Sequence, residues 1–344
     1  DVAWVPGDLI FEEKVLEHAP RAVLKKLINI AEKKGYKMLC GVEPEFMLIS
    51  SENFEISDKH DISQKPCYDQ QALMRRYEFI SEICGYLKIL GWGNYQVDHE
   101  DANGQFEINW NYSDPLTTSD RHVFFKYMIK SVAENYNLRA TFMPKPFDHL
   151  TGNGCHVHIS LWDKTLDNNL FKDDLNNFGL SPLAFNFIGG LIDNASGMCA
   201  ITNPTVNSYK RLIARSTNSG TTWAPNTVSY GGNDRTHMIR TPAPGRIELR
   251  LPDGAANPYL TMAALLSAGM EGIEKKINPD QKPNKIKKLP FCLNDSLREF
   301  QINKVFKDHL GEEFCDAYLK LKLNEWREFS SKVTKWEKEN TINC

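Results

Sequence analysis

Four short segments of this 344-residue chain alternate apolar residues with residues that bind metals or anions. Because successive side chains of a strand point to opposite faces of its sheet, each segment predicts a strand with one apolar and one reactive face. GVEPEF (41–46) carries two glutamates in this pattern, GNGCHVHISL (152–161) two histidines and a serine, and GRIELRL (245–251) two arginines flanking a glutamate. In QVDHEDANGQFEIN (96–109), a glycine turn separates Glu100 from Glu107. The pattern predicts half-buried, mostly antiparallel strands.

Between these segments the sequence predicts amphipathic helices. The expected helical ranges are 20–34, 69–90, 119–136, 182–200 and 259–276, with a helical tail over about 291–340. Strands and helices follow one another irregularly, which favours the α+β class with a curved, open, barrel-like sheet surrounded by helices. A stretch rich in Pro, Lys and Asn at 278–290 predicts a linker before the tail. We expect one domain over residues 1–344.

Composition excludes several classes of partner. A net charge of −3 and a pI near 6.3 give no support for a nucleic-acid or anionic-membrane partner. The longest apolar run, 259–270, is too short and too mixed to span a bilayer. Eight cysteines without a C-x-x-C pair are typical of free thiols in a reducing compartment, and no signal peptide is visible. These observations predict a cytoplasmic protein.

The reactive faces have two interpretations. For any one segment alone, a solvated polar face is the better explanation. Taken together, however, the four faces carry Glu, His and Arg almost exclusively. Each close pair of glutamates would cost about 4 kcal/mol at an effective dielectric of ~20, so we expect cations to neutralise them. Oxygen ligands with an imidazole suit Mg²⁺ or Mn²⁺, and arginines suit phosphate or carboxylate.

Divalent metals beside arginines favour phosphoryl transfer from a nucleotide. The chain has neither G-x-x-x-x-G-K-[ST] nor G-x-G-x-x-G, which argues against P-loop and Rossmann enzymes. Three alternatives remain open. A guanidino kinase would not need the glutamate set, a metallohydrolase would not need five arginines together, and a non-catalytic protein of the same fold would be expected to lose metal ligands.

Five motifs occur in one order along the chain: E-P-E-F, H-E-x-x-x-G-Q-x-E, G-x-G-C-H-x-H-I-S, N-P-x-x-N-S-Y-K-R and G-R-I-E-x-R-x-P-D-x-x-A-N-P-Y-L. Together they resemble the catalytic domain of glutamine synthetases, from about Asp8 to Glu337. The resemblance is strongest to the type III bacterial branch, which includes γ-glutamylmethylamide synthetases, also called glutamate–methylamine ligases. It implies the glutamine synthetase catalytic fold and a ligase that joins glutamate to ammonia or a small amine.

The resemblance also implies roles for individual residues. Two or more Mg²⁺ or Mn²⁺ ions are implied per site, one held by Glu45, Glu100 and Glu107 and a second by Glu43, His156 and Glu248. The positions that match contacts to ATP and its phosphates are His158, Ser160, Arg240 and Arg246. Those that match glutamate contacts are Gly152, Arg211 and Arg250. Arg235 matches a residue that steadies the transferring phosphate, so Arg211 and Arg235 are the expected catalytic residues.

The implied reaction has two steps. The γ-carboxylate of glutamate takes the γ-phosphate of ATP, and an amine then attacks the acyl phosphate.

Two positions depart from the family pattern. Trp223, in T-W-A-P, stands where a carboxylate that helps to bind ammonium is expected, and Thr151 replaces an amide side chain. Because an indole forms a flat apolar wall, Trp223 favours methylamine or another small primary amine. The alternatives are a glutamate–ammonia ligase, or a Trp223 that only packs the flap.

The family carries a small N-terminal β-grasp domain, which supplies an aspartate to the site of a neighbouring subunit. This sequence begins with Asp1, after the point where that domain would end, so we expect either a fragment of a longer chain or an incomplete ring assembly. In either case we expect residues 1–344 alone to bind nucleotide weakly and turn over poorly. The resemblance further implies a homo-oligomer, a dodecamer of two hexameric rings. We recognise no tyrosine modification loop, so regulation by adenylylation is not expected.

Overall fold

The computed structural model describes residues 3–214, 216–281 and 287–344. Within these residues the chain forms one open sheet of eight strands, antiparallel except where β9 runs parallel to β10. In order across the sheet, the strands are β4 (Asn94–His99), β5 (Gln105–Trp110), β3 (Lys37–Ser50), β7 (Cys155–Trp162), β11 (Arg246–Leu249), β10 (Ile239–Ala243) and β9 (Tyr230–Gly231), with β6 (Leu138–Thr141) pairing with β3 off this path. The expected α+β class with a mostly antiparallel, unclosed sheet is confirmed.

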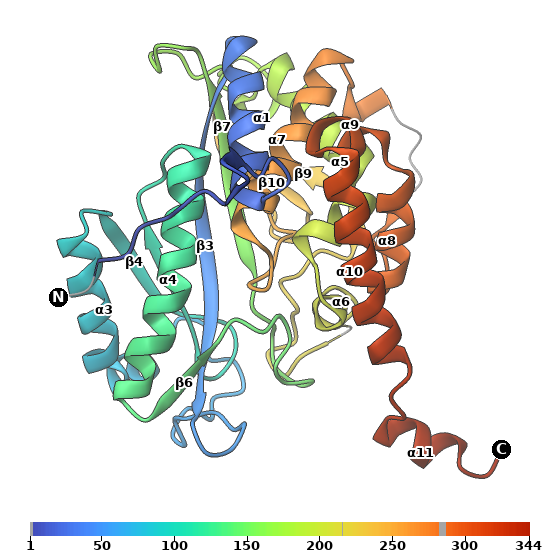
Figure 1. Cartoon of the computed structure of the whole chain (residues 1–344). Helices are drawn as coiled ribbons and strands as arrows, with labels where there is room; N and C mark the ends of the chain where they lie inside the picture. The colour runs from blue at the N-terminus through green and yellow to red at the C-terminus, as the bar shows by residue number, and fades with distance from the viewer. Residues whose placement is uncertain (1–2, 215, 282–286) are drawn as a thin grey trace.

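Strand β3, which is 14 residues long, changes partners along its length (Figure 1). It pairs with β7 up to Pro44, and with β5 and β6 from Glu45 onward. Pro44 therefore stands at the change of partner, where a residue without a backbone N–H is best tolerated in a sheet. Beyond this point the second face of β3 is also buried, because Met47 and Ile49 form a small second core. The reactive face of β3 thus ends at Glu45.

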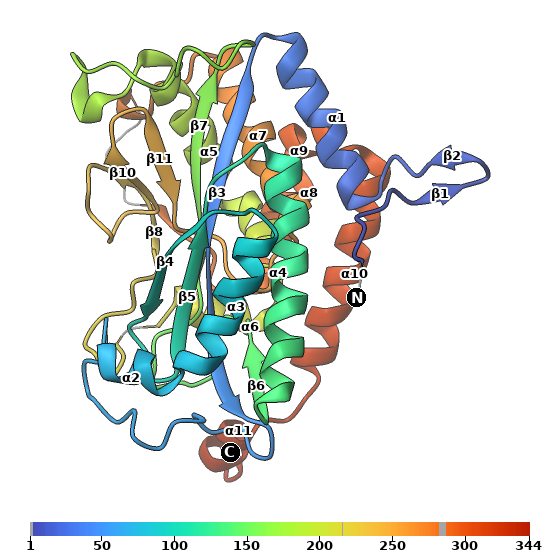
Figure 2. The same cartoon turned by 90° about the vertical axis from the view of Figure 1, so that its left-hand side faces the viewer.

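Helices cover the apolar face of the sheet. Figure 2 shows α1 (Pro20–Lys33), α3 (Tyr77–Ile89) and α4 (Pro115–Asn135) on one side of it. Val157, Ile159 and Leu161 of β7 belong to the main core together with Leu24 of α1 and Phe125 of α4. The alternate residues of β7 therefore lie on the side away from this core, as the period-two pattern predicts.

Two long central helices, α5 (Pro182–Thr202) and α7 (Pro258–Glu274), pack against each other. They come close together at Gly190, where a Cβ atom would collide with the backbone of Ala268 and Gly272. Helices α1, α4, α5 and α7 each have proline in their first turn, where its missing N–H costs nothing. Asp114, Ser181 and Asn257 cap three of them.

Three helix predictions need correction. The helix predicted at 119–136 begins at Pro115, because Asp114 caps it through the N–H groups of Leu116 and Thr117. The helix predicted at 69–90 is capped by Asp69 but breaks at Arg76 into α2 (Gln70–Arg75) and α3. The tail divides into several helices: α8 (Leu293–Ile302), α9 (Lys304–Leu310), α10 (Glu312–Ser330) and α11 (Lys335–Thr341).

The remaining elements are short. They are α6 (Val206–Leu212), the 3-10 helices Asn177–Gly179 and Pro279–Gln281, and the strand pairs β1 (Ile10–Phe11) with β2 (Lys14–Val15) and β8 (Thr227–Val228) with β12 (Lys287–Lys288). The β1–β2 hairpin projects from the body (Figure 2), as does α11 (Figure 1). Part of the predicted linker, residues 282–286, lies outside the described residues.

Each of the eight cysteines is a free thiol. Over the described part of the chain, each helix is too short or too polar to cross a bilayer.

Candidate active site

The register of the strands brings the predicted site residues together. Across β3 and β7, Glu43 pairs with His156 and Gly41 with His158. His158 in turn pairs with Glu248 of β11. Because paired residues on neighbouring strands present their side chains to the same face, these carboxylates and imidazoles converge.

The same arrangement repeats on the other side of β3. Glu45 is the direct partner of Glu107 on β5, and Glu107 is the direct partner of Asp98 on β4. Glu100 follows β4 in the turn closed by Gly104, which has a φ of +68°. One polar pocket collects the side chains of both groups. Its lining includes the predicted residues Glu43, Glu45, Glu100, Glu107, Gly152, His156, Arg211, Trp223, Arg235, Arg240 and Arg250.

A second cavity, of about 410 Å³, adjoins this pocket. His158, Ser160 and Arg246 line it, and so do the aromatic residues Tyr95, Trp110, Tyr112 and Trp162. Glu43 lines both cavities. The residues expected to contact ATP are thus separated from those expected to contact glutamate, except that Arg240 lies in the first pocket.

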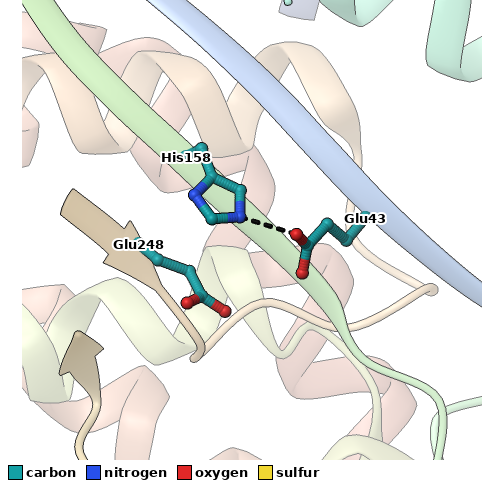
Figure 3. A group of neighbouring side chains, drawn as sticks. All are labelled: Glu43, His158 and Glu248. Carbon is teal, nitrogen blue, oxygen red and sulfur yellow. Dashed lines mark hydrogen bonds and ion pairs between the residues drawn. The ribbon is translucent and has the colours of Figure 1, made fainter. Parts of the chain in front are cut away.

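Glu43, His158 and Glu248 form one acidic cluster, with ligand atoms within 4.8 Å of one another. Figure 3 shows the three side chains converging, with His158 Nε2 2.7 Å from Glu43 Oε1. His156 lies between the same two carboxylates, with its Nδ1 3.4 Å from Glu43 and 3.5 Å from Glu248. The structure therefore offers two imidazoles to this cluster, whereas the family resemblance implied His156 as its ligand and His158 as a phosphate contact.

Hydrogen bonds and nearby positive charge keep the carboxylates of this cluster ionised. Burial raises the pKa of Glu43, but hydrogen bonds from His156 and His158 outweigh it and hold that pKa well below its usual range. Glu248 is completely buried. Burial raises its pKa as well, but the charges of His156, Arg250 and His158 lower it further than burial raises it. This half of the site is an electrostatically compensated network.

Asp98, Glu100 and Glu107 form a second acidic cluster within the same distance limit. Burial, together with the charges of Glu45, Asp98 and Glu43, raises the pKa of Glu100 to about 8. Burial and the charges of Glu100, Glu43 and Glu45 raise the pKa of Glu107 well above its usual range. The charge of Arg235 offsets only part of this repulsion at Glu100, and a divalent cation among these oxygens would remove the rest. The donor set therefore fits a hard cation such as Mg²⁺ or Mn²⁺.

Glu45 is held in place beside the second cluster. Its Oε2 accepts hydrogen bonds from the Gly154 backbone at 2.7 Å and from Gln105 Nε2 at 2.9 Å. Gln105 also donates to the carbonyl of Gly152 at 3.1 Å. Gly152 itself has no room for a side chain, because a Cβ there would collide with the carbonyl of Pro144 and crowd Arg211. The predicted glycine is thus required by the packing of the pocket wall.

The arginines close the other side of the pocket. Arg250 Nη1 lies 2.6 Å from Glu248 Oε1, and Arg240 Nε lies 2.7 Å from Glu248 Oε2. Arg250 also donates from Nη2 to the backbone carbonyl of Trp223 at 3.1 Å. Arg211, almost completely buried, donates to the carbonyls of Leu251 and Arg250. The guanidinium carbon of Arg235 lies 5.7 Å from the centre of the Trp223 ring.

Several residues of the site were not predicted. Asp98 belongs to the second cluster, and its alternation with Gln96 and Glu100 could have indicated it. Asp101 accepts hydrogen bonds from the hydroxyls of Thr151 and Ser219, which fixes the segment before Trp223 beside Glu100. No local sequence signal identifies that contact, because 118 positions separate Asp101 from Ser219.

Comparison with known proteins agrees with this geometry. Residues 17–341 match the family described as glutamine synthetase, catalytic domain. A glutamine synthetase of Rhizobium meliloti is 53% identical, with 100% of this chain and 81% of the relative aligned. A glutamate–methylamine ligase of Methyloversatilis universalis is 39% identical, with 98% of this chain and 80% of the relative aligned. A solved structure titled as a GmaS/ADP complex superimposes with a TM-score of 0.93 at 52% identity, covering 98% of this chain and 80% of that one. The predicted resemblance is confirmed, and the chain belongs to the glutamine synthetase family of ligases, whose catalytic domain it carries.

Proposed function

We propose that this protein joins the γ-carboxylate of glutamate to an amine at the expense of ATP, through γ-glutamyl phosphate. The observation that carries the proposal is the pair of adjoining cavities that share Glu43. One cavity is lined by carboxylates and arginines, and the other by aromatic rings with His158, Ser160 and Arg246. Such a pair supports a reaction in which a nucleotide phosphate meets a carboxylate at the boundary.

The second cavity is the proposed nucleotide site. Tyr95, Tyr112 and Trp162 offer ring faces for a base, while Arg246 and Ser160 offer donors for phosphates. His158 lies at the boundary with the first cavity, and its Nδ1 is buried without a hydrogen-bond partner among the described residues. The GmaS structure that superimposes on this chain is titled as an ADP complex, which supports the assignment.

Glutamate occupies the first cavity in this proposal, beside Gly152, Arg211 and Arg250. Arg250 Nε is buried and unpartnered among the described residues, so it is a donor available to a substrate carboxylate. Arg235, an exposed residue at the edge of the pocket, steadies the phosphoryl group as it moves between the two anions. The arginines lower the barrier by offsetting the charge of two anions that otherwise repel.

Two cation positions follow from the two acidic clusters. Glu45, Glu100, Glu107 and Asp98 would hold one ion, and Glu43 and Glu248 with His156 or His158 would hold the other. A divalent cation bound there supplies positive charge to the phosphates and orients them. His156 as the imidazole ligand, and Mg²⁺ or Mn²⁺ as the bound ion, stay predictions.

In the chemical sequence, a γ-carboxylate oxygen attacks the γ-phosphorus of ATP and the bond to ADP breaks. The amine nitrogen then attacks the acyl carbon, and phosphate leaves. Release of phosphate from ATP that requires both glutamate and an amine tests the proposal. Release without glutamate would instead indicate a hydrolase, transfer to a guanidino compound a kinase, and no release at all a non-catalytic protein.

For the amine, we favour methylamine or another small primary amine over ammonia. The relatives' names include both glutamine synthetase and glutamate–methylamine ligase, so they support either acceptor. Trp223 lines the pocket where the family pattern has a carboxylate. Arg235 already lies over its ring, so an apolar contact with the methyl group, rather than a cation–π contact, is the expected interaction. A higher kcat/KM for ammonium than for methylammonium would overturn this preference.

We also propose a homo-oligomer, with a dodecamer of two hexameric rings as the expected form. Ile10 and Phe11 of the projecting β1–β2 hairpin are 61% and 64% exposed, and Trp336 of α11 is 67% exposed. Apolar groups presented this way support contacts between copies of the chain. Light scattering coupled to size-exclusion chromatography measures the assembly, and a monomer at micromolar concentration would contradict it.

A further inference from the structure

One buried network outside the proposed ligand set joins two loops beside the second acidic cluster. Its centre is Asp61, in the loop between β3 and α2, and its partner is His99, the last residue of β4. Both side chains are almost completely buried, 1% and 0% exposed. His99 Nε2 lies 2.7 Å from Asp61 Oδ2. Figure 2 shows this loop at the end of the sheet where β4 ends.

Asp61 also binds the turn that follows His99. Its Oδ2 accepts a hydrogen bond from the Gly104 backbone at 2.6 Å, and its Oδ1 accepts one from Asn103 Nδ2 at 2.8 Å. One carboxylate therefore contacts both ends of the 99–104 segment. Glu100 lies within this segment, and its backbone N–H donates to Gln105 at 2.9 Å. The position of Glu100 is thus tied to Asp61 through the turn.

Both ring nitrogens of His99 have hydrogen-bond partners, and its ring packs against an aromatic residue. Its Nδ1 lies 3.1 Å from the carbonyl of Pro66, and its ring packs edge to face on Phe106 at 5.3 Å. The carbonyl of His99 accepts a hydrogen bond from the Tyr68 backbone at 2.9 Å. Tyr68 lines the pocket, and its hydroxyl lies 3.5 Å from Arg235 Nη1. The network therefore reaches both a carboxylate of the second cluster and a side chain beside Arg235.

We propose that Asp61 and His99 are positioning residues that set the affinity of the Asp98–Glu100–Glu107 cluster for a divalent cation. The physical reason is that Glu100 and Glu107 repel each other, so the turn must be held for both oxygens to stay within reach of one ion. Partners that orient ligands in this way are worth about 10- to 100-fold in metal affinity. The inference rests on the proposed function only in treating this cluster as a cation site.

The decisive variant is Asp61→Asn, which keeps the size of the side chain but presents an amide N–H₂ to groups that themselves donate. Mn²⁺ binding to the metal-free protein, followed by the electron paramagnetic resonance of free Mn²⁺, measures affinity without any turnover. We expect one class of sites to weaken at least about tenfold. The Glu107→Gln variant should lose that same class, which identifies it.

Asp58→Asn is the matched control. Asp58 lies in the same loop and is also buried. Its side chain bonds to Arg75 at 2.6 Å and to the His60 backbone at 3.0 Å, and among the described residues it makes no hydrogen bond or ion pair with the 99–104 turn. Unchanged Mn²⁺ affinity in Asp61→Asn, or an equal loss in Asp58→Asn, would overturn the proposal. If Asp61→Asn fails to fold, Asn103→Ala decides, because it removes one of these hydrogen bonds from a partly exposed residue. A smaller weakening there supports the proposal, and parental affinity overturns it.

These readouts separate this inference from the proposed ligase activity. A parent protein that binds Mn²⁺ but releases no phosphate with glutamate and amine would contradict the proposed function alone. In that case the comparison between the Asp61 and Asp58 variants still tests the positioning role.

Discussion

Glu45 and Glu107 are direct partners across the antiparallel pair β3–β5, and both side chains are buried. Like charges placed opposite each other in a sheet destabilise it. The fold therefore carries a repulsion in the β3–β5 pair, at the place where β3 changes partners. Such a cost is typical of sites that bind a cation. Repulsion between the ligands lowers the free energy of unfolding when the site is empty, and binding of the ion raises it again.

Replacing Glu107 with Gln should therefore separate stability from metal binding. Without divalent ions, we expect the variant to melt at the same temperature as the parent or higher, because one buried carboxylate is removed. With Mn²⁺ at 100 times its Kd, the parent should gain about 2.7 kcal/mol and the variant little. Thermal unfolding with and without Mn²⁺ measures both effects. The exposed Glu52→Gln serves as control, and a metal-free variant much less stable than the parent would contradict the argument.

Arg250 should be required for stability as well as for substrate binding. Its guanidinium pairs with the fully buried Glu248 and also binds the backbone of Trp223. Removing one partner of a buried ion pair leaves an uncompensated charge, so Arg250→Met should lower the free energy of unfolding by about 3 kcal/mol. Arg246→Met is the control, because Arg246 lies on β11 just before Arg250 but is exposed. Urea unfolding measures both, and equal stability of the two variants would refute the prediction.

The fold and much of the site could be predicted from local patterns. Alternation in β3 and β7 assigned Glu43, Glu45, His156 and His158 to one face without any knowledge of the partners of these strands. What alternation does not contain is register, since a shift of one residue between strands would have left the sequence pattern unchanged. Glu45, Glu107 and Asp98 converge because the register of β3, β5 and β4 places them directly opposite one another.

Contacts between distant loops could not be predicted for a related reason. Asp61 meets His99 across 38 positions, and Asp101 meets Ser219 across 118. Neither pair follows a helical or strand period, because loop packing rather than secondary structure brings them together. The helix breaks at Arg76 and in the tail were also missed. The backbone leaves helical angles at Arg76 (φ −111°, ψ 15°), Asn303 (φ −76°, ψ 107°) and Gly311 (φ 99°, ψ 141°).

His122 predicts how stability depends on pH. It is buried on α4, and burial lowers its pKa to about 3. The unfolded chain binds a proton near pH 6.5, and the folded chain does not, so its contribution is present above pH 6.5 and is lost as pH falls toward 3. In this window the parent should lose about 1.4 kcal/mol per pH unit more than His122→Gln. Urea unfolding at pH 7.5 and 5.5 measures the difference, and parallel pH dependence would exclude this role.

Trp223 should decide between amines through its side chain alone. Arg250 binds its backbone carbonyl, so substitutions of the side chain keep the anchor of the segment. A methyl group in an apolar pocket is worth roughly 10- to 200-fold in discrimination. We therefore expect Trp223→Glu to lower the ratio of kcat/KM for methylammonium over ammonium at least about tenfold, because a carboxylate favours the smaller cation.

Trp223→Phe tests the physical basis of that preference. It keeps an apolar ring beside Arg235 but removes the indole N–H, which is buried and unpartnered among the described residues. If the wall is what matters, the phenylalanine variant should keep most of the parental ratio while the glutamate variant loses it. Trp336→Phe, at an exposed position on α11, controls for the loss of an indole elsewhere. Equal ratios in the parent and the glutamate variant would mean that the amine is selected by other residues, and the role of Trp223 would be limited to packing the segment over the pocket.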